Sequence, residues 1–133
     1  MIKERLSKVE EAIHKSALLA GRNLENITLI GVSKKKDISK IKLAFEAGLK
    51  NIGENYVEEF SSKVNVYNPK DLNYHFIGRL PTKKVRKIVG KVPLIHSVSS
   101  LKLAKKIDFV ANEEGIIQEI LIQINQGGES SKS

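Results

Sequence analysis

The spacing of apolar residues predicts an amphipathic helix at the start of the chain, followed by a short strand. Apolar residues recur every three or four positions over residues 2–20, on one face of a helix, and Gly21 is a natural end for it. Residues 27–32 (Ile-Thr-Leu-Ile-Gly-Val) then form a nearly continuous apolar run. Such a run is typical of a parallel strand that is buried on both faces.

The alternation of apolar runs and helical patterns continues along the chain. The pattern predicts further strands over residues 50–53, 73–78, 92–97 and 118–125, and helices over 38–47, 56–66, 81–90 and 101–114. The tail, residues 126–133, is polar and loop-like. Strands that alternate with helices through short connections indicate an α/β fold with a parallel sheet and right-handed crossovers.

Two architectures fit this order of elements: an open, doubly wound sheet of five strands, or part of a (β/α)8 (TIM) barrel. A complete barrel takes ~250 residues, whereas this chain has 133. The pattern alone therefore favours the open sheet. No linker or low-complexity segment divides the chain, so we expect one domain over residues 1–133.

Composition narrows the class of protein. No apolar run reaches the roughly 18 residues of a membrane span, the first residues lack the apolar segment of a signal peptide, and there is no cysteine. These features predict a cytoplasmic protein without disulfides. The net charge is +8, but acidic residues are interleaved with the basic ones, and only 5% of residues are aromatic. A solvated basic surface explains this better than a nucleic-acid-binding module, which needs stacking platforms.

Candidate chemistry gathers where the predicted strands end, because ligands bind at the carboxyl ends of parallel strands in both architectures. Lys34 directly follows the first strand, so partial desolvation and the like charges of Lys35 and Lys36 favour its neutral amine, a nucleophile for an aldehyde. For a bare run of three lysines, a solvated loop is the commoner explanation. Polar residues at the other strand ends are Glu54, Asn55, Arg79, His96, Ser97 and Asn125, with His75 inside the third strand.

Other motifs compete weakly with the lysine cluster. There is no G-x-G-x-x-G or P-loop motif. His75 and His96 lack a nearby third ligand, so strand histidines are a better interpretation than zinc. Residues 127–131 (Gly-Gly-Glu-Ser-Ser) suit a phosphate cradle or, more simply, a flexible turn. Glu54 is a candidate base. The basic residues of 83–87 are expected to form a solvent-exposed helix face.

Five short motifs, in order and with matching spacing, carry a resemblance to a known family. Together they resemble the YggS/PROSC family of pyridoxal phosphate homeostasis proteins, from about Asn26 to Ser133. The motifs are Gly-Val-Ser-Lys-Lys-Lys at 31–36, Gly-Glu-Asn-Tyr-Val-Glu-Glu at 53–59, His-Phe-Ile-Gly-Arg-Leu at 75–80, Pro-Leu-Ile-His-Ser-Val at 93–98, and Asn125 with Glu129 and Lys132.

The resemblance implies a barrel like the N-terminal domain of alanine racemase, preceded by an extra helix. It implies pyridoxal 5′-phosphate (PLP) as cofactor, held as a Schiff base on a lysine at the end of the first strand, here Lys34. Asn55, His75 and Ser97 would then lie near the cofactor. Family members are regarded as non-enzymatic carriers or regulators of PLP homeostasis. The chain departs from the family pattern at Lys35, Asp37, Pro81, Lys83 and Ser99.

The family barrel continues for roughly another hundred residues, in line with the usual barrel size. The resemblance therefore implies a partial (β/α)8 barrel: an N-terminal helix and about five strands, truncated before the phosphate-binding loops. Two unpaired strand edges predict self-association. Two alternatives stay open. A racemase-like, PLP-dependent enzyme would need an acid-base residue from another domain, and a nucleic-acid-binding module would account for the charge of +8.

Overall fold

Helices with strong end signals alternate with short strands along the whole computed structural model, which describes residues 1–126. The segment 127–131, Glu129 and Lys132 lie outside these described residues. The elements are α1 (Ile2–Ala20), η1 (Leu24–Asn26), β1 (Gly31–Val32), α2 (Ile38–Glu46), β2 (Asn51–Glu54), α3 (Val57–Val66), β3 (Asn73–Phe76), η2 (Thr82–Lys87), β4 (Ile95–Val98), α4 (Leu101–Glu114) and β5 (Ile120–Ile122).

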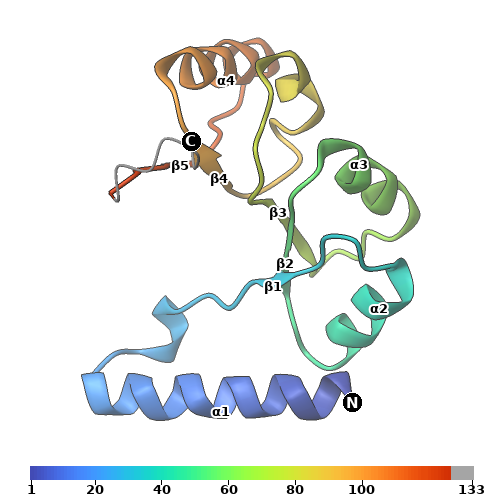
Figure 1. Cartoon of the computed structure of the whole chain (residues 1–133), viewed down its shortest axis with the longest axis vertical. Helices are drawn as coiled ribbons and strands as arrows, with labels where there is room; N and C mark the ends of the chain where they lie inside the picture. Colours follow the sequence, from blue (N-terminus) through green and yellow to red (C-terminus); the bar gives the residue numbers. More distant parts are fainter. Residues whose placement is uncertain (127–133) are drawn as a thin grey trace.

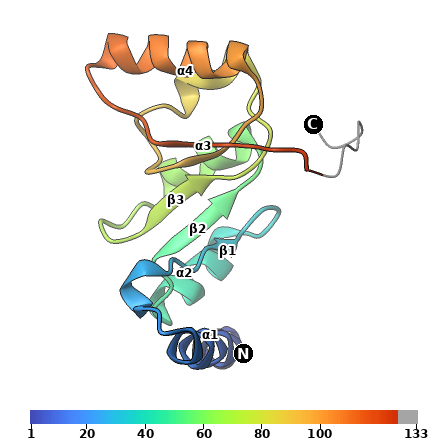
Figure 2. The same cartoon turned by 90° about the vertical axis from the view of Figure 1, so that its left-hand side faces the viewer.

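The strands form one parallel sheet in the order β1-β2-β3-β4-β5, so each strand pairs with the next one along the chain. A doubly wound sheet would reverse its strand order at a switch point. The consecutive order is that of a barrel, and it confirms the predicted partial (β/α)8 arrangement. Helices α2, α3 and α4 follow one side of the curved sheet, and α1 lies beyond β1 against α2 (Figures 1 and 2).

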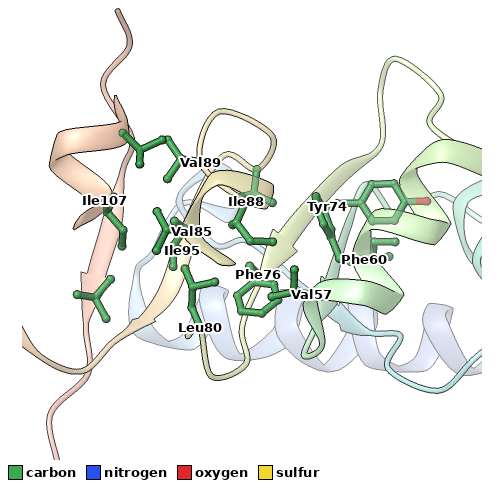
Figure 3. Close-up of a cluster of buried hydrophobic side chains, with 14 of the residues drawn as sticks. Val57, Phe60, Tyr74, Phe76, Leu80, Val85, Ile88, Val89, Ile95 and Ile107 are labelled. Carbon is green, nitrogen blue, oxygen red and sulfur yellow. The ribbon is translucent and has the colours of Figure 1, made fainter. Parts of the chain in front are cut away.

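The core lies between the sheet and these helices (Figure 3). Phe76 and Ile95 are fully buried, and Tyr74 stacks edge-on against Phe60 of α3 with ring centroids 6.0 Å apart. Burying one such side chain stabilises the fold by roughly 1.5–3 kcal/mol. Alternate residues of each strand face this core, which leaves the other face of the sheet without a helix layer.

Local end signals explain why the predictions for α1 and α4 are accurate. Ser100 accepts a hydrogen bond from the Leu103 N–H (3.1 Å) at the start of α4, and Gly115 ends α4 in the left-handed conformation (φ 69°). Gly21 ends α1 in the same way. These are the usual capping residues at each end of a helix, so both helices are confirmed within a residue of their predicted bounds.

Several predicted elements are wrong in detail, and the strand predicted over residues 92–97 is displaced to Ile95–Val98. The predicted helix over residues 81–90 is a shorter 3₁₀ helix, in which the Lys84 N–H bonds to the Pro81 carbonyl (2.9 Å). The first strand covers only Gly31–Val32, and the last only Ile120–Ile122. The first strand is also not buried on both faces, since Val32 is 56% exposed. Both strands are sheet edges, where one side has no strand to pair with.

No helix within residues 1–126 is long and apolar enough to cross a membrane.

Candidate functional site

Lys34 stands in the turn that follows β1, and its side chain is exposed. Within the described part of the chain it makes no hydrogen bond or ion pair. The prediction that this lysine is partly desolvated is wrong, because the residue is exposed to solvent. The amine of Lys34 is therefore accessible from solvent at the carboxyl end of β1.

The turn itself has an uncommon backbone. Lys35 has φ 59°, and it is the one non-glycine residue among residues 1–126 with a positive φ. The left-handed conformation costs an L-residue roughly 1–2 kcal/mol. Two hydrogen bonds stabilise the turn: the Lys36 N–H donates to the Ser33 carbonyl (3.1 Å), and the Lys35 N–H donates to Glu59 Oε2 of α3 (2.6 Å).

Beneath this turn lies an ionic cluster of Ser33, Glu54, Glu59 and Lys63, in which only Glu59 is partly exposed. Lys63 Nζ is 2.9 Å from both Glu54 Oε2 and Glu59 Oε2, and it donates to the Ser33 carbonyl at 2.7 Å. The Ser33 hydroxyl donates to Glu54 Oε2. Two carboxyl groups thus share one ammonium group. Burial, with the charge of Glu54 as a second cause, raises the pKa of Tyr74 to about 12.

Sequence reasoning missed Lys63, although the sequence contains a signal for it. Lys63 falls three residues after Phe60 and six after Val57, on the apolar face of α3, and all three side chains are buried. A lysine on the apolar face of a helix is rarely buried unless it is paired. It also follows Glu59 at the i, i+4 spacing of helix ion pairs. Glu54, considered as a base, is instead an ion-paired residue of the interior.

Asn55 extends from the end of β2, on the strand beside that of Lys34. Val32 is in register with Gly53, so Lys34 and Asn55 each come two residues after a paired position. The Asn55 Oδ1 is buried and has no hydrogen-bond partner among the described residues. Buried polar atoms normally have a partner, so an unpaired acceptor at a strand end suits a ligand that donates a hydrogen bond.

Gly78 and Ser97 support Asn55 from the neighbouring strands. A Cβ atom at Gly78 would lie 2.0 Å from the Asn55 carbonyl oxygen, so the close approach of the two backbones requires glycine. Ser97 is buried, and its hydroxyl donates to the Gly78 carbonyl. The structure thus places Ser97 behind the strand ends, with its hydrogen already used in holding Gly78.

His75 belongs to a separate polar group. Its Nε2 lies 2.9 Å from Asn51 Oδ1, and its Nδ1 lies 3.1 Å from His96 Nε2. Burial lowers the pKa of both histidines, and the charge of His96 lowers the pKa of His75 further. Asn51 begins β2, so the contact through Nε2 extends toward the amino ends of the strands, away from the turn that carries Lys34. No group of three metal-binding side chains occurs within residues 1–126.

The basic stretch over residues 83–87 is engaged on the surface. Lys84 and Lys87 form ion pairs with Glu58 (2.6 and 3.1 Å), and Arg86 pairs with Glu113. These contacts lower the pKa of the exposed Glu58. The stretch is a solvated face, as predicted, apart from Val85, which is fully buried.

Comparisons with known proteins find no matching family model, but they find close relatives. The chain is 44% identical over 129 residues to the pyridoxal phosphate homeostasis protein of Aquifex aeolicus, covering 97% of this chain and 57% of the relative. It is 36% identical over 135 residues to the Escherichia coli K12 protein of the same name, covering 99% and 58%. The chain is homologous to the pyridoxal phosphate homeostasis proteins. This confirms the resemblance predicted from the sequence.

Two solved structures of PipY agree with the fold. PipY of Synechococcus elongatus without PLP has a TM-score of 0.83 and 31% identity, and the match covers 100% of this chain and 58% of PipY. PipY with PLP bound has a TM-score of 0.79 and 32% identity, over 95% of this chain and 55% of PipY. The chain thus spans well under two thirds of the length of these relatives.

Proposed function

We propose that the chain binds PLP through Lys34 and takes part in PLP homeostasis. The observation that carries this proposal is the exposed, unpaired amine of Lys34 on a turn held in place at the carboxyl end of β1. The names of the relatives and the PipY structure with PLP bound support it.

The residues around Lys34 fit this cofactor. PLP would supply an aldehyde, and the primary amine of Lys34 would hold it as the predicted Schiff base. Asn55 would hold a donor group of the ligand through its unpaired Oδ1. Ser97 would act through Gly78 and Asn55. Direct contact of His75 with the cofactor stays a prediction, and its bonds to Asn51 and His96 do not support it.

We further propose that the chain acts without catalytic turnover. A racemase-like reaction needs an acid or base opposite the cofactor lysine. Two carboxylates beneath the turn, those of Glu54 and Glu59, are both ion-paired to Lys63. The relatives' names describe homeostasis and state no reaction. Incubation with D- and L-amino acids plus PLP should give only the cofactor's own background, and saturable turnover that disappears in Lys34→Ala would refute this part of the proposal.

Labelling tests the cofactor lysine. After incubation with PLP and reduction with borohydride, peptide mass analysis should place the pyridoxyl group on Lys34. Lys34→Ala should lose the label and the cofactor's shifted absorbance, whereas Lys35→Ala and Lys36→Ala should keep both. A label on Lys35 or Lys36 in the unchanged chain would overturn the assignment.

We also propose that the 133-residue chain, as one domain, self-associates through its strand edges and binds PLP weakly. Val32, Leu121 and Ile122 of β1 and β5 are 56%, 48% and 72% exposed, and apolar sheet edges template pairing with other chains. Sedimentation combined with a PLP titration tests this. A monomer that binds PLP as tightly as a full-length relative would show that five strands are self-sufficient.

A further inference from the structure

Lys34 carries its amine on a flexible side chain, so the direction of that side chain depends on the backbone around it. Two peptide groups flank its Cα atom, one containing the Ser33 carbonyl and the other the Lys35 N–H. Each of them is bonded to a side chain of α3. Lys63 Nζ donates to the Ser33 carbonyl (2.7 Å), and Glu59 Oε2 accepts from the Lys35 N–H (2.6 Å).

The two bonds belong to one ionic unit. Lys63 Nζ and Glu59 Oε2 are 2.9 Å apart, so the group that holds one peptide plane also orients the group that holds the other. Glu54 Oε2, at 2.9 Å from Lys63 Nζ, fixes this unit to the end of β2. Hydrogen bonds between charged groups are shorter and stronger than neutral ones, so this unit is a firm support.

Helix α3, which carries Glu59 and Lys63, is itself packed into the core. Helix α3 packs into the core through Val57 and Phe60, which are 5% and 1% exposed. The side chain of Lys63 is 8% exposed, and it extends from this helix to a strand end thirty residues earlier in the sequence. A site held by packed helices and strands is positioned more accurately than one on a free loop.

The left-handed Lys35 makes this support necessary. Its φ of 59° is one that an L-residue leaves when nothing holds it. Loss of the Glu59 contact would let the Lys34–Lys35 peptide rotate and would carry the Lys34 side chain with it.

We propose that Lys63 and Glu59 are positioning residues, which lock both peptide groups around Lys34 and so present its amine to an aldehyde ligand. The inference rests on the proposed role of Lys34 as the cofactor lysine. It predicts that the unit controls how selectively PLP reacts with Lys34 over Lys35 and Lys36.

The test compares Lys63→Met, Lys63→Arg, Glu59→Ala and Glu59→Gln with a matched control, Lys84→Met. Lys84 also forms an ion pair with α3, through Glu58 at 2.6 Å, but lies outside the turn. The readout is the rate of borohydride-trapped labelling of Lys34 and its ratio to labelling of Lys35 and Lys36. Helix content by circular dichroism identifies any variant that has unfolded, and Glu59→Ala decides the question if Lys63→Met does not fold.

We expect Lys63→Met and Glu59→Ala to slow labelling of Lys34 by roughly tenfold or more and to lower its ratio to the other two lysines. Lys63→Arg and Glu59→Gln keep a donor and an acceptor, so they should restore part of the selectivity. Lys84→Met should label like the unchanged chain. Unchanged rate and ratio in folded Lys63→Met or Glu59→Ala would overturn the proposal.

Hydrogen exchange of the Lys35 amide separates this proposal from the function on which it rests. If the unchanged chain takes no PLP, the proposed function fails, and the positioning role is then judged without the cofactor. Lys63→Met should speed exchange of the Lys35 amide by roughly tenfold, although Lys63 does not itself touch that N–H. Exchange as slow as in the unchanged chain would overturn the positioning role by itself.

Discussion

The two faces of the central strands differ sharply, although they are made by alternate residues of the same backbone. The face toward the helices carries Ile52, Phe76 and Ile95, each at most 2% exposed. The opposite face of the same strands carries Asn51, His75 and His96, joined by hydrogen bonds. Packing of the first face against the helices stabilises the fold, so the other face is available for polar groups.

The largest expected difference between the faces is in the free energy of unfolding that is lost when a side chain is truncated. Phe76→Ala removes a fully buried ring and should lower the free energy of unfolding by about 3–5 kcal/mol. Val32→Ala truncates a side chain of the opposite face that is 56% exposed, so the change should stay within about 0.5 kcal/mol. Urea denaturation of both variants measures this, and equal losses would mean that the second face is also packed.

Backbone contact between strands should give the next largest effect. In Gly78→Ala the new methyl group meets the Asn55 backbone at 2.0 Å, which should cost about 2 kcal/mol or more. In Gly31→Ala the nearest atom is a side-chain methyl of Leu49 at 2.6 Å, which can move aside, so the loss should be smaller. Urea midpoints of the two variants test this order, and a larger loss in Gly31→Ala would reverse our account of where the sheet is rigid.

The histidines should make the polar face sensitive to acid. Burial lowers the folded-state pKa of His75 and His96 below the ordinary 6.5, so the unfolded chain binds protons first as the pH falls. The free energy of unfolding should therefore decrease as the pH drops through about 6.5 toward the lower folded pKa. Urea midpoints at several pH values measure the slope. A double variant, His75→Gln with His96→Gln, should flatten it, and an unchanged slope would place the acid sensitivity elsewhere.

The smallest effect on stability is expected at the edge of the sheet. Ile122→Lys changes a β5 side chain that is 72% exposed, so the free energy of unfolding should move by less than about 0.5 kcal/mol. Charged residues on an edge strand oppose pairing between chains, and this variant should therefore sediment as a smaller species. Unchanged sedimentation would show that β5 takes no part in self-association.

Local signals make the ends of α1 and α4 predictable, whereas distant contacts decide where the strands begin and end. Ser100 and Gly115 mark the ends of α4 within a few residues of the helix itself. The lengths of β1 and β5 depend instead on whether another strand lies alongside, which no local pattern records. The position of Lys34 at a strand end was predictable, whereas its exposure was not.

In the candidate site, too, contacts between residues distant in the sequence could not be predicted. The link between Lys63 and Ser33 joins residues thirty positions apart, and only the fold brings them together. Asn55 was predicted near the cofactor from the resemblance, but its buried, unpaired oxygen required the structure. The paired histidines lie on different strands, so their mutual contact followed from the sheet register rather than from sequence spacing.

The consecutive strand order has a consequence for how the chain acquires its structure. Each strand pairs with the next strand, about twenty residues further along, so every pairing closes a loop of similar size at a similar entropic cost. Folding can therefore advance one strand and one helix at a time, in the order in which a ribosome releases them. We expect nascent chains ending after successive helices to gain protease resistance in steps rather than all at once.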